Sequence, residues 1–231
     1  PAWLAVRPAR RSRAIGKPLM AGQIALSTVL VVAAALFSRT LLNLQRVDVG
    51  FVADRLATFI LEPARSGYDP ARAADLYARI EERLRRIPGV RAVAVAGSGS
   101  GMLWGTDSNA DVFLLAGADR GESKFQFVDM NFFETMGIRL RRGRLFSAQD
   151  SATSTRVAVV SESFVRAFLG ERDPLGQRIA GQPQTPMERQ IEIVGIVSDS
   201  KVNSLRQSAP PIFYRPIAQT PSPVRTIVVR T

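Results

Sequence analysis

The hydrophobic pattern of this chain begins with one long apolar run. Residues 19–37 contain no charged side chain, and as a helix they would be roughly 30 Å long, about the hydrocarbon thickness of a bilayer. The five basic residues just before the run are Arg7, Arg10, Arg11, Arg13 and Lys17. This excess of positive charge predicts a transmembrane helix whose N-terminal side, residues 1–18, is a basic segment in the cytoplasm.

A secretory signal peptide is the alternative interpretation of the same run. A basic segment, an apolar core and the small residues at 33–35 resemble the three regions of such a leader. However, Phe37, Leu41 and Leu44 follow at i, i+4 and i+7, which is the spacing of one helix face. We therefore expect the helix to continue as a stalk to about residue 46. The chain also starts at Pro1 rather than Met, so we expect it to be cut from a longer protein.

After the stalk, short apolar stretches alternate with helical patterns. The clearest helix has Asp69 as its N-cap and Pro70 at its first position, and it ends at Pro88-Gly89. The side chains expected on its buried face are Leu76, Ile80, Leu84 and Ile87. A second helix is expected over 161–169 and one short helical turn over 131–136. Strands are expected over 56–61, 90–96, 111–115, 124–130, 138–140, 157–160, 191–197, 211–217 and 226–230.

These elements predict an α+β fold for residues 48–231. Two strand–helix–strand units, over 56–96 and 157–197, are separated by a strand-rich middle. Residues 97–156 are expected to contribute much of a second lobe. No further long apolar run follows residue 37, so the pattern predicts a single crossing of the bilayer within this stretch.

Composition excludes several kinds of chemistry. The chain has no cysteine and no histidine, which excludes disulfides, Cys/His zinc sites, thiol nucleophiles and any histidine-based triad. Its net charge is +11, but all 20 acidic residues and 24 of the 31 basic ones lie after residue 47, so the folded part is nearly balanced. Nucleic-acid binding therefore has little support. For the basic run over 139–144, a solvated turn or a phosphate contact at a membrane surface is the favoured interpretation.

Two loop motifs are incomplete. The glycine-rich loop over 97–101 lacks the Gly-Lys-Ser/Thr ending of a phosphate-binding loop, and Met102 stands where a dinucleotide-binding loop has its third glycine. We interpret it as a connector. Asp107, Asn109 and Asp111 match the start of a calcium loop, but Val112 replaces its glycine and Ala118 its bidentate glutamate. We therefore expect no cofactor and no metal.

The remaining polar residues give no catalytic set. The candidate acid–base carboxylates are Glu162, Glu171, Asp173 and Asp199, but their spacing fixes no pair on one face, and we interpret them as solvated. A Ser–Lys hydrolase has only Lys124 and Lys201 to draw on after the apolar run. Gln23 within the run could contact another transmembrane helix or lie near the headgroups. We therefore predict no catalytic residues and no enzyme.

Several segments, in order along the chain, resemble the MacB-like family of ABC transporter permeases in the FtsX/MacB superfamily. The resemblance is strongest to one half of the duplicated permeases, in which the whole unit occurs twice. The segments that carry it are residues 23–27, 44–51, 83–90, 131–138, 142–146, 157–162, 173–179 and 193–199.

The resemblance implies a transmembrane helix of the bacterial inner membrane that carries a periplasmic core domain. This domain would have a porter-like lobe built from the two strand–helix–strand units and a strand-rich second lobe. The implied partners are a separate cytoplasmic ABC ATPase, another permease half or a second copy, and the lipid bilayer. Such permeases couple ATP use in the cytoplasm to export or mechanical work in the periplasm.

An extracytoplasmic binding or sensor domain is the competing hypothesis, because it would also combine one span with a non-catalytic α+β domain. Its chain would cross the membrane once more, into a signalling helix or a kinase. A duplicated permease would instead have three further spans after residue 231 and a similar unit before residue 1.

Overall fold

The computed structural model describes residues 13–45, 50–52, 54–97, 109–114, 120–180, 190–201, 208–219 and 225–231. The chain divides into two compact units, Pro1–Val47 and Asp48–Thr231. Each unit is described by itself. We call the second unit the core domain.

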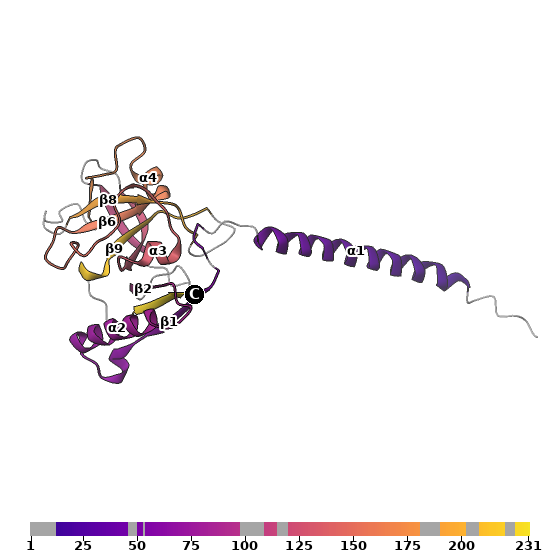
Figure 1. The fold of residues 1–231 in the computed structure, drawn as a ribbon. Helices are drawn as coiled ribbons and strands as arrows, with labels where there is room; N and C mark the ends of the chain where they lie inside the picture. The colour runs from indigo at the N-terminus through magenta and orange to yellow at the C-terminus, as the bar shows by residue number, and fades with distance from the viewer. Residues whose placement is uncertain are drawn as a thin grey trace, which may run out of the picture. The chain divides into compact units, whose positions relative to one another are not determined.

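The first unit contains one long helix, α1, from Arg13 to Gln45 (Figure 1). It begins earlier than the apolar run and continues past residue 37, as the helical spacing predicts. The hydroxyls of Thr28 and Thr40 donate to the carbonyls of Ile24 and Leu36, at 2.9 Å each, which satisfies both groups within the helix. By length and composition, Pro18–Asn43 is able to cross a membrane, a criterion that a signal sequence also meets.

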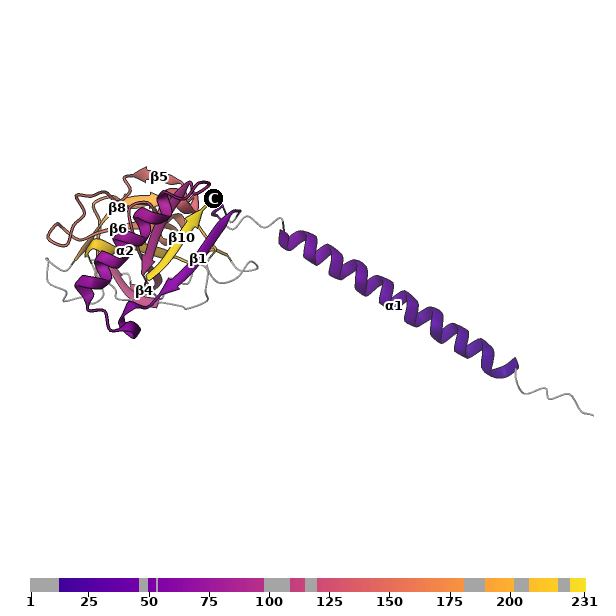
Figure 2. The ribbon, with the colours of Figure 1, turned by 60° about the horizontal axis from the view of Figure 1, so that its bottom comes forward.

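The first lobe of the core domain is a small sheet covered by a helix. Its strands are β1 (Leu56–Leu61), β10 (Arg225–Arg230) and β2 (Ala92–Gly97). Strand β10 lies between the other two and is antiparallel to both, so β1 and β2 are parallel. The last strand of the described chain thus separates the two strands of the first strand–helix–strand unit (Figure 2).

Helix α2 (Pro70–Arg85) covers this sheet. The Asp69 side chain caps it by accepting a hydrogen bond from the Arg72 N–H at 2.9 Å, as predicted. Its buried face differs from the predicted one. Ala73 and Tyr77 are buried, Leu76, Ile80 and Leu84 are partly buried, and Ile87 lies beyond the helix end and is half exposed. The Tyr77 hydroxyl donates to the Leu61 carbonyl at 2.8 Å, so a hydrogen bond links this face of the helix to the end of β1.

The second lobe is a closed ring of strands. Its members are β3 (Asn109–Leu114), β4 (Arg120–Val128), β6 (Val157–Ser161), β7 (Arg178–Ala180), β8 (Ile191–Val197) and β9 (Ile212–Pro216). They pair in the order β4-β3-β7-β8-β6-β9, and β9 then pairs in parallel with β4. The mixed α/β character expected from the sequence is confirmed. The second strand–helix–strand unit, β6-α4-β8, has its strands in this ring rather than in the first sheet.

Three short elements surround the ring. They are α3 (Phe132–Met136), α4 (Glu162–Phe168) and β5 (Leu140–Gly143), which pairs with β8. Strand β5 lies within the basic run over 139–144, where a turn is one of the expectations. Most of the run forms an exposed strand instead, because its backbone pairs with the part of the β8 edge that β7 does not cover.

One of the three apolar clusters among the described residues contains side chains of both lobes. Ala94 of β2 and Val228 of β10 pack in the same cluster as Phe132, Phe133 and Tyr214 from the second lobe. Phe133 and Tyr214 meet edge to face, with ring centroids 5.1 Å apart. Helix α3 thus joins the first sheet to the ring, and a displacement of either lobe must disturb this cluster.

Candidate functional site

The chain enters the core domain through a short segment that we call the junction segment, residues 50–52, 54 and 55. The Val52 N–H donates to the Met136 carbonyl at 2.8 Å, at the end of α3. The Thr231 N–H donates to the Arg55 carbonyl at 3.0 Å. The last described residue of the core domain is therefore hydrogen-bonded to the junction segment.

One side chain joins all the parts of this junction. The Arg230 guanidinium donates to three backbone carbonyls: from Nε to Thr135 at 2.6 Å, from Nη2 to Val52 at 2.9 Å and from Nη1 to Asp54 at 3.3 Å. The last carbonyls of a helix have no partner within it, and Arg230 supplies one to α3. A fork of five rigid N–H donors suits this task better than a lysine ammonium.

Two glycines allow the junction segment to pack this closely. Gly50 has φ +76°, and a Cβ there would lie 1.9 Å from the Asp199 carbonyl oxygen. Gly137, which ends α3, has φ +71°, and a Cβ there would lie 2.7 Å from the Val52 side chain. Any other residue at either position would be strained and would also push the junction segment away from the core domain.

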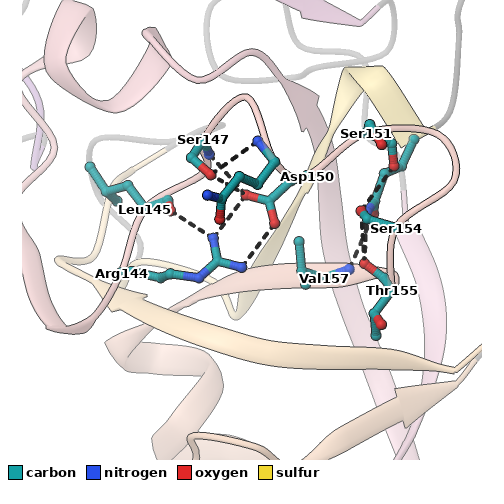
Figure 3. A network of polar contacts seen from close by, with 10 residues as sticks. Arg144, Leu145, Ser147, Asp150, Ser151, Ser154, Thr155 and Val157 are labelled. Carbon is teal, nitrogen blue, oxygen red and sulfur yellow. Dashed lines mark hydrogen bonds and ion pairs between the residues drawn. The ribbon is translucent and has the colours of Figure 1, made fainter.

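A second polar network fixes the loop between β5 and β6 (Figure 3). Arg144 and Asp150 form two parallel hydrogen bonds of 2.8 Å each, and the Ser147 N–H donates to the same carboxylate at 2.8 Å. The Arg144 hydrogen bonds lower the pKa of the buried Asp150 carboxyl despite its burial. The bidentate geometry is the stronger form of an arginine–carboxylate pair.

Replacing Asp150 with asparagine should lower the free energy of unfolding by about 2 kcal/mol at pH 7. A carboxyl with a lowered folded-state pKa adds stability above its unfolded pKa and loses it as the pH falls through the folded pKa. The difference between the two proteins should therefore shrink in acid. Urea unfolding at several pH values measures it. The control is Asp173→Asn, whose ion pair with Arg142 is exposed and should contribute under 1 kcal/mol.

A cleft of about 590 Å³ separates α2 from the second lobe, and we call it the inter-lobe cleft. Glu81 and Arg85 line it from α2, Asp129 lines it from the end of β4, and Asp150 lines it from the loop just described. Burial raises the pKa of Asp129 to about 7, and the nearby Glu81 charge adds to the rise. Burial also raises the pKa of Glu81, while the Arg85 charge, paired with it at 3.0 Å, opposes the shift.

The carboxylates singled out in the sequence meet arginines rather than one another. Glu162 pairs with Arg141 at 3.4 Å, Asp173 pairs with Arg142 at 3.2 Å, and Asp199 pairs with Arg166. Glu171 is exposed and lines a shallow surface cleft together with Glu162 and Asp173. The structure therefore presents ion pairs at Glu162, Asp173 and Asp199.

The other sequence candidates give little more. Residues 98–108, which include Met102 and Asp107, lie outside the described residues. Asn109 and Asp111 are part of strand β3. Among the described residues, no group of three or more acidic side chains is placed to hold a metal ion.

A family model described as the MacB-like periplasmic core domain matches residues 19–231. The chain belongs to this family. The fold agrees, because the crystal structure of the periplasmic region of MacB from Actinobacillus actinomycetemcomitans superimposes with a TM-score of 0.51. That match has 18% sequence identity and covers 78% of this chain and 76% of the other.

Two curated relatives are both named as macrolide export ATP-binding/permease proteins. The macrolide export ATP-binding/permease protein MacB of Aggregatibacter actinomycetemcomitans is 24% identical over 108 residues, 45% of this chain and 16% of that protein. MacB 2 of Aeromonas hydrophila subsp. hydrophila is 40% identical over 50 residues, 22% of this chain and 8% of that protein. The matches thus span only a small part of the length of these relatives.

The junction of this MacB-like core domain is a feature that the sequence pattern does not reveal. Arg230 stands at the end of a predicted strand, where an arginine is ordinary. Its partners come from the junction segment and from α3, which lie far from it in the chain. The local signal is a pair of glycines with positive φ: Gly137, which directly follows α3, and Gly50 in the junction segment.

Proposed function

We propose that this chain belongs to the permease subunit of an ABC-type transporter and that it transmits the work of a cytoplasmic ATPase to the periplasm. Membership of the MacB-like family supports the transporter class. In this proposal α1 spans the inner membrane with its N-terminal side in the cytoplasm. The ATPase is a separate chain, and a second permease half or a second copy completes the transporter.

The observation that carries the proposal is the Arg230 junction. A force on the chain that enters the core domain reaches Val52 and Asp54 first, and Arg230 ties both to β10 and to α3. Strand β10 is the middle strand of the first lobe, and α3 packs in the core that both lobes share. A displacement of the junction segment would therefore move the two lobes instead of stretching a loose linker.

The partnership with an ATPase is tested by purifying the intact parent protein from membranes in mild detergent. We expect an ABC ATPase to copurify with it and to hydrolyse ATP in a vanadate-sensitive manner. Deletion of α1 from the intact protein should remove this activity from the purified sample. Recovery of a histidine kinase instead of an ATPase would support the competing sensor function and contradict the transporter proposal.

The orientation is tested separately in the intact parent protein. Residues 1–231 contain no cysteine, so only cysteines outside this stretch need to be replaced by serine before a single thiol is introduced. A single Arg83→Cys substitution places a thiol on the exposed side of α2. We expect a membrane-impermeant maleimide to label it in spheroplasts, whereas Ser12→Cys should react only after the inner membrane is permeabilised. The reverse pattern would contradict the proposed orientation.

A further inference from the structure

A second cleft, which we call the entry cleft, lies beside the junction segment and has a volume of about 390 Å³. The residues that line it include Arg139, Arg141, Lys201, Glu162, Asp199 and Ser198. Three of these are cationic and two are anionic. The volume falls at the lower end of the range for small-molecule sites.

Both carboxylates of the entry cleft already have partners. Asp199 accepts a hydrogen bond of 2.6 Å from the Ser163 N–H and pairs with Arg166, which lies outside this cleft. Glu162 pairs with Arg141 at 3.4 Å. The charge of Asp199 is thus balanced from outside, and cationic side chains outnumber anionic ones along the cleft lining.

The cationic side has a rigid base and adjustable side chains. The backbone of Arg139 is held on both sides by Ser198, whose hydroxyl accepts from the Arg139 N–H at 3.2 Å and whose N–H donates to the Arg139 carbonyl at 2.8 Å. The Arg139 side chain is exposed, and no ion pair involves it within the described part of the chain. Arg141 and Glu162 are 48% and 37% exposed, so their pair is weak and Arg141 can turn to another anion.

We propose that the entry cleft binds a phosphate-bearing anion through Arg139, Arg141 and Lys201. Two guanidinium groups and an ammonium beside one cleft are the usual donors to phosphate oxygens. Two sources share this chemistry: the headgroup of an anionic phospholipid and a soluble phosphate ester. The lipid source has support in the sequence, because only residues 46–49 lie between the end of α1 and Gly50. This binding site does not depend on the proposed coupling to an ATPase.

The test titrates the intact protein, in a neutral detergent, with four probes. These are dihexanoyl phosphatidylglycerol, dihexanoyl phosphatidylcholine, glycerol 3-phosphate and inorganic phosphate, each at matched ionic strength in isothermal titration calorimetry. We expect saturable binding of at least one of the three anionic probes. Binding of phosphatidylglycerol at least tenfold tighter than that of glycerol 3-phosphate identifies a lipid headgroup, whereas glycerol 3-phosphate binding as tightly as phosphatidylglycerol or more tightly identifies a soluble ester.

The variant Arg139→Gln/Arg141→Gln should weaken this binding at least tenfold, and Lys201→Gln should weaken it on its own. The matched control is Arg83→Gln, which removes the same charge from an exposed position on α2 and should leave binding unchanged. Circular dichroism confirms that each variant is folded. The proposal is overturned if no anionic probe saturates, or if Arg83→Gln reduces binding as much as the cleft variants do.

Discussion

Replacing Arg230 with methionine is expected to lower the free energy of unfolding of the core domain by about 3 kcal/mol. The substitution keeps the apolar stem but removes all three hydrogen bonds to the carbonyls of Thr135, Val52 and Asp54. Hydrogen bonds from a charged donor are worth more than neutral ones, and the Thr135 carbonyl, whose bond is part-buried, would be left without this partner, which adds to the loss. Urea unfolding of the protein in detergent, followed by far-UV circular dichroism, measures the change.

The control for this prediction is Arg91→Met. Arg91 precedes β2, is exposed, and meets Arg230 only through its backbone N–H, which donates to the Arg230 carbonyl at 2.7 Å. Its replacement should change the unfolding free energy by less than about 0.5 kcal/mol. Arg230→Lys should fall between the two, because one ammonium cannot match the fork of donors. Equal stability of the Arg230→Met and Arg91→Met proteins would contradict the assigned role of the junction.

Replacing Asp129 with asparagine is expected to stabilise the core domain at pH 8, by up to about 4 kcal/mol. The folded-state pKa of Asp129 is about 7, against an ordinary value of 3.8, and each unit corresponds to about 1.4 kcal/mol. Because burial raises this pKa, the wild-type protein loses stability as the pH rises from about 4 to 7. Asparagine carries no charge to desolvate and still accepts the hydrogen bond from the Asn131 N–H.

The gain should therefore be largest above pH 7 and should vanish below about pH 3, where the carboxyl is protonated in both the folded and the unfolded state. Urea unfolding across this range is the measurement. Glu81→Gln should lower the pKa of Asp129, since the Glu81 charge contributes to its rise. A gain that is the same at every pH would mean that packing, rather than the charge of Asp129, is responsible.

Much of the core domain was predictable because its strands are short, apolar and bounded by turn residues. The strands at 56–61 and 191–197 have the predicted bounds, and Asp69 caps α2 as expected. In these places the local sequence preferences agree with the final structure.

What the pattern did not reveal depends on contacts between distant segments. Strand β7 has only three residues and gains its place by pairing with β3 and β8. Strand β10 lies between β1 and β2. The hydrophobic periodicity of a sequence predicts where strands form but not the order in which they pair. The buried face of α2 includes Tyr77, because the Tyr77 hydroxyl donates a hydrogen bond to the Leu61 carbonyl on β1. The predicted face was based on apolar side chains alone and did not include this residue.

The coupling function is tested most directly by a distance measured across the inter-lobe cleft in the intact protein with its ATPase. Spin labels at Arg83→Cys on α2 and Ala148→Cys on the opposite side occupy exposed positions, and pulsed electron paramagnetic resonance reports their separation. We predict that the separation changes when ATP is bound and that Arg230→Met abolishes the change while Arg91→Met preserves it. If the labelled protein that keeps Arg230 gives the same distance distribution with and without ATP, the result contradicts the transmission of ATPase work to the core domain.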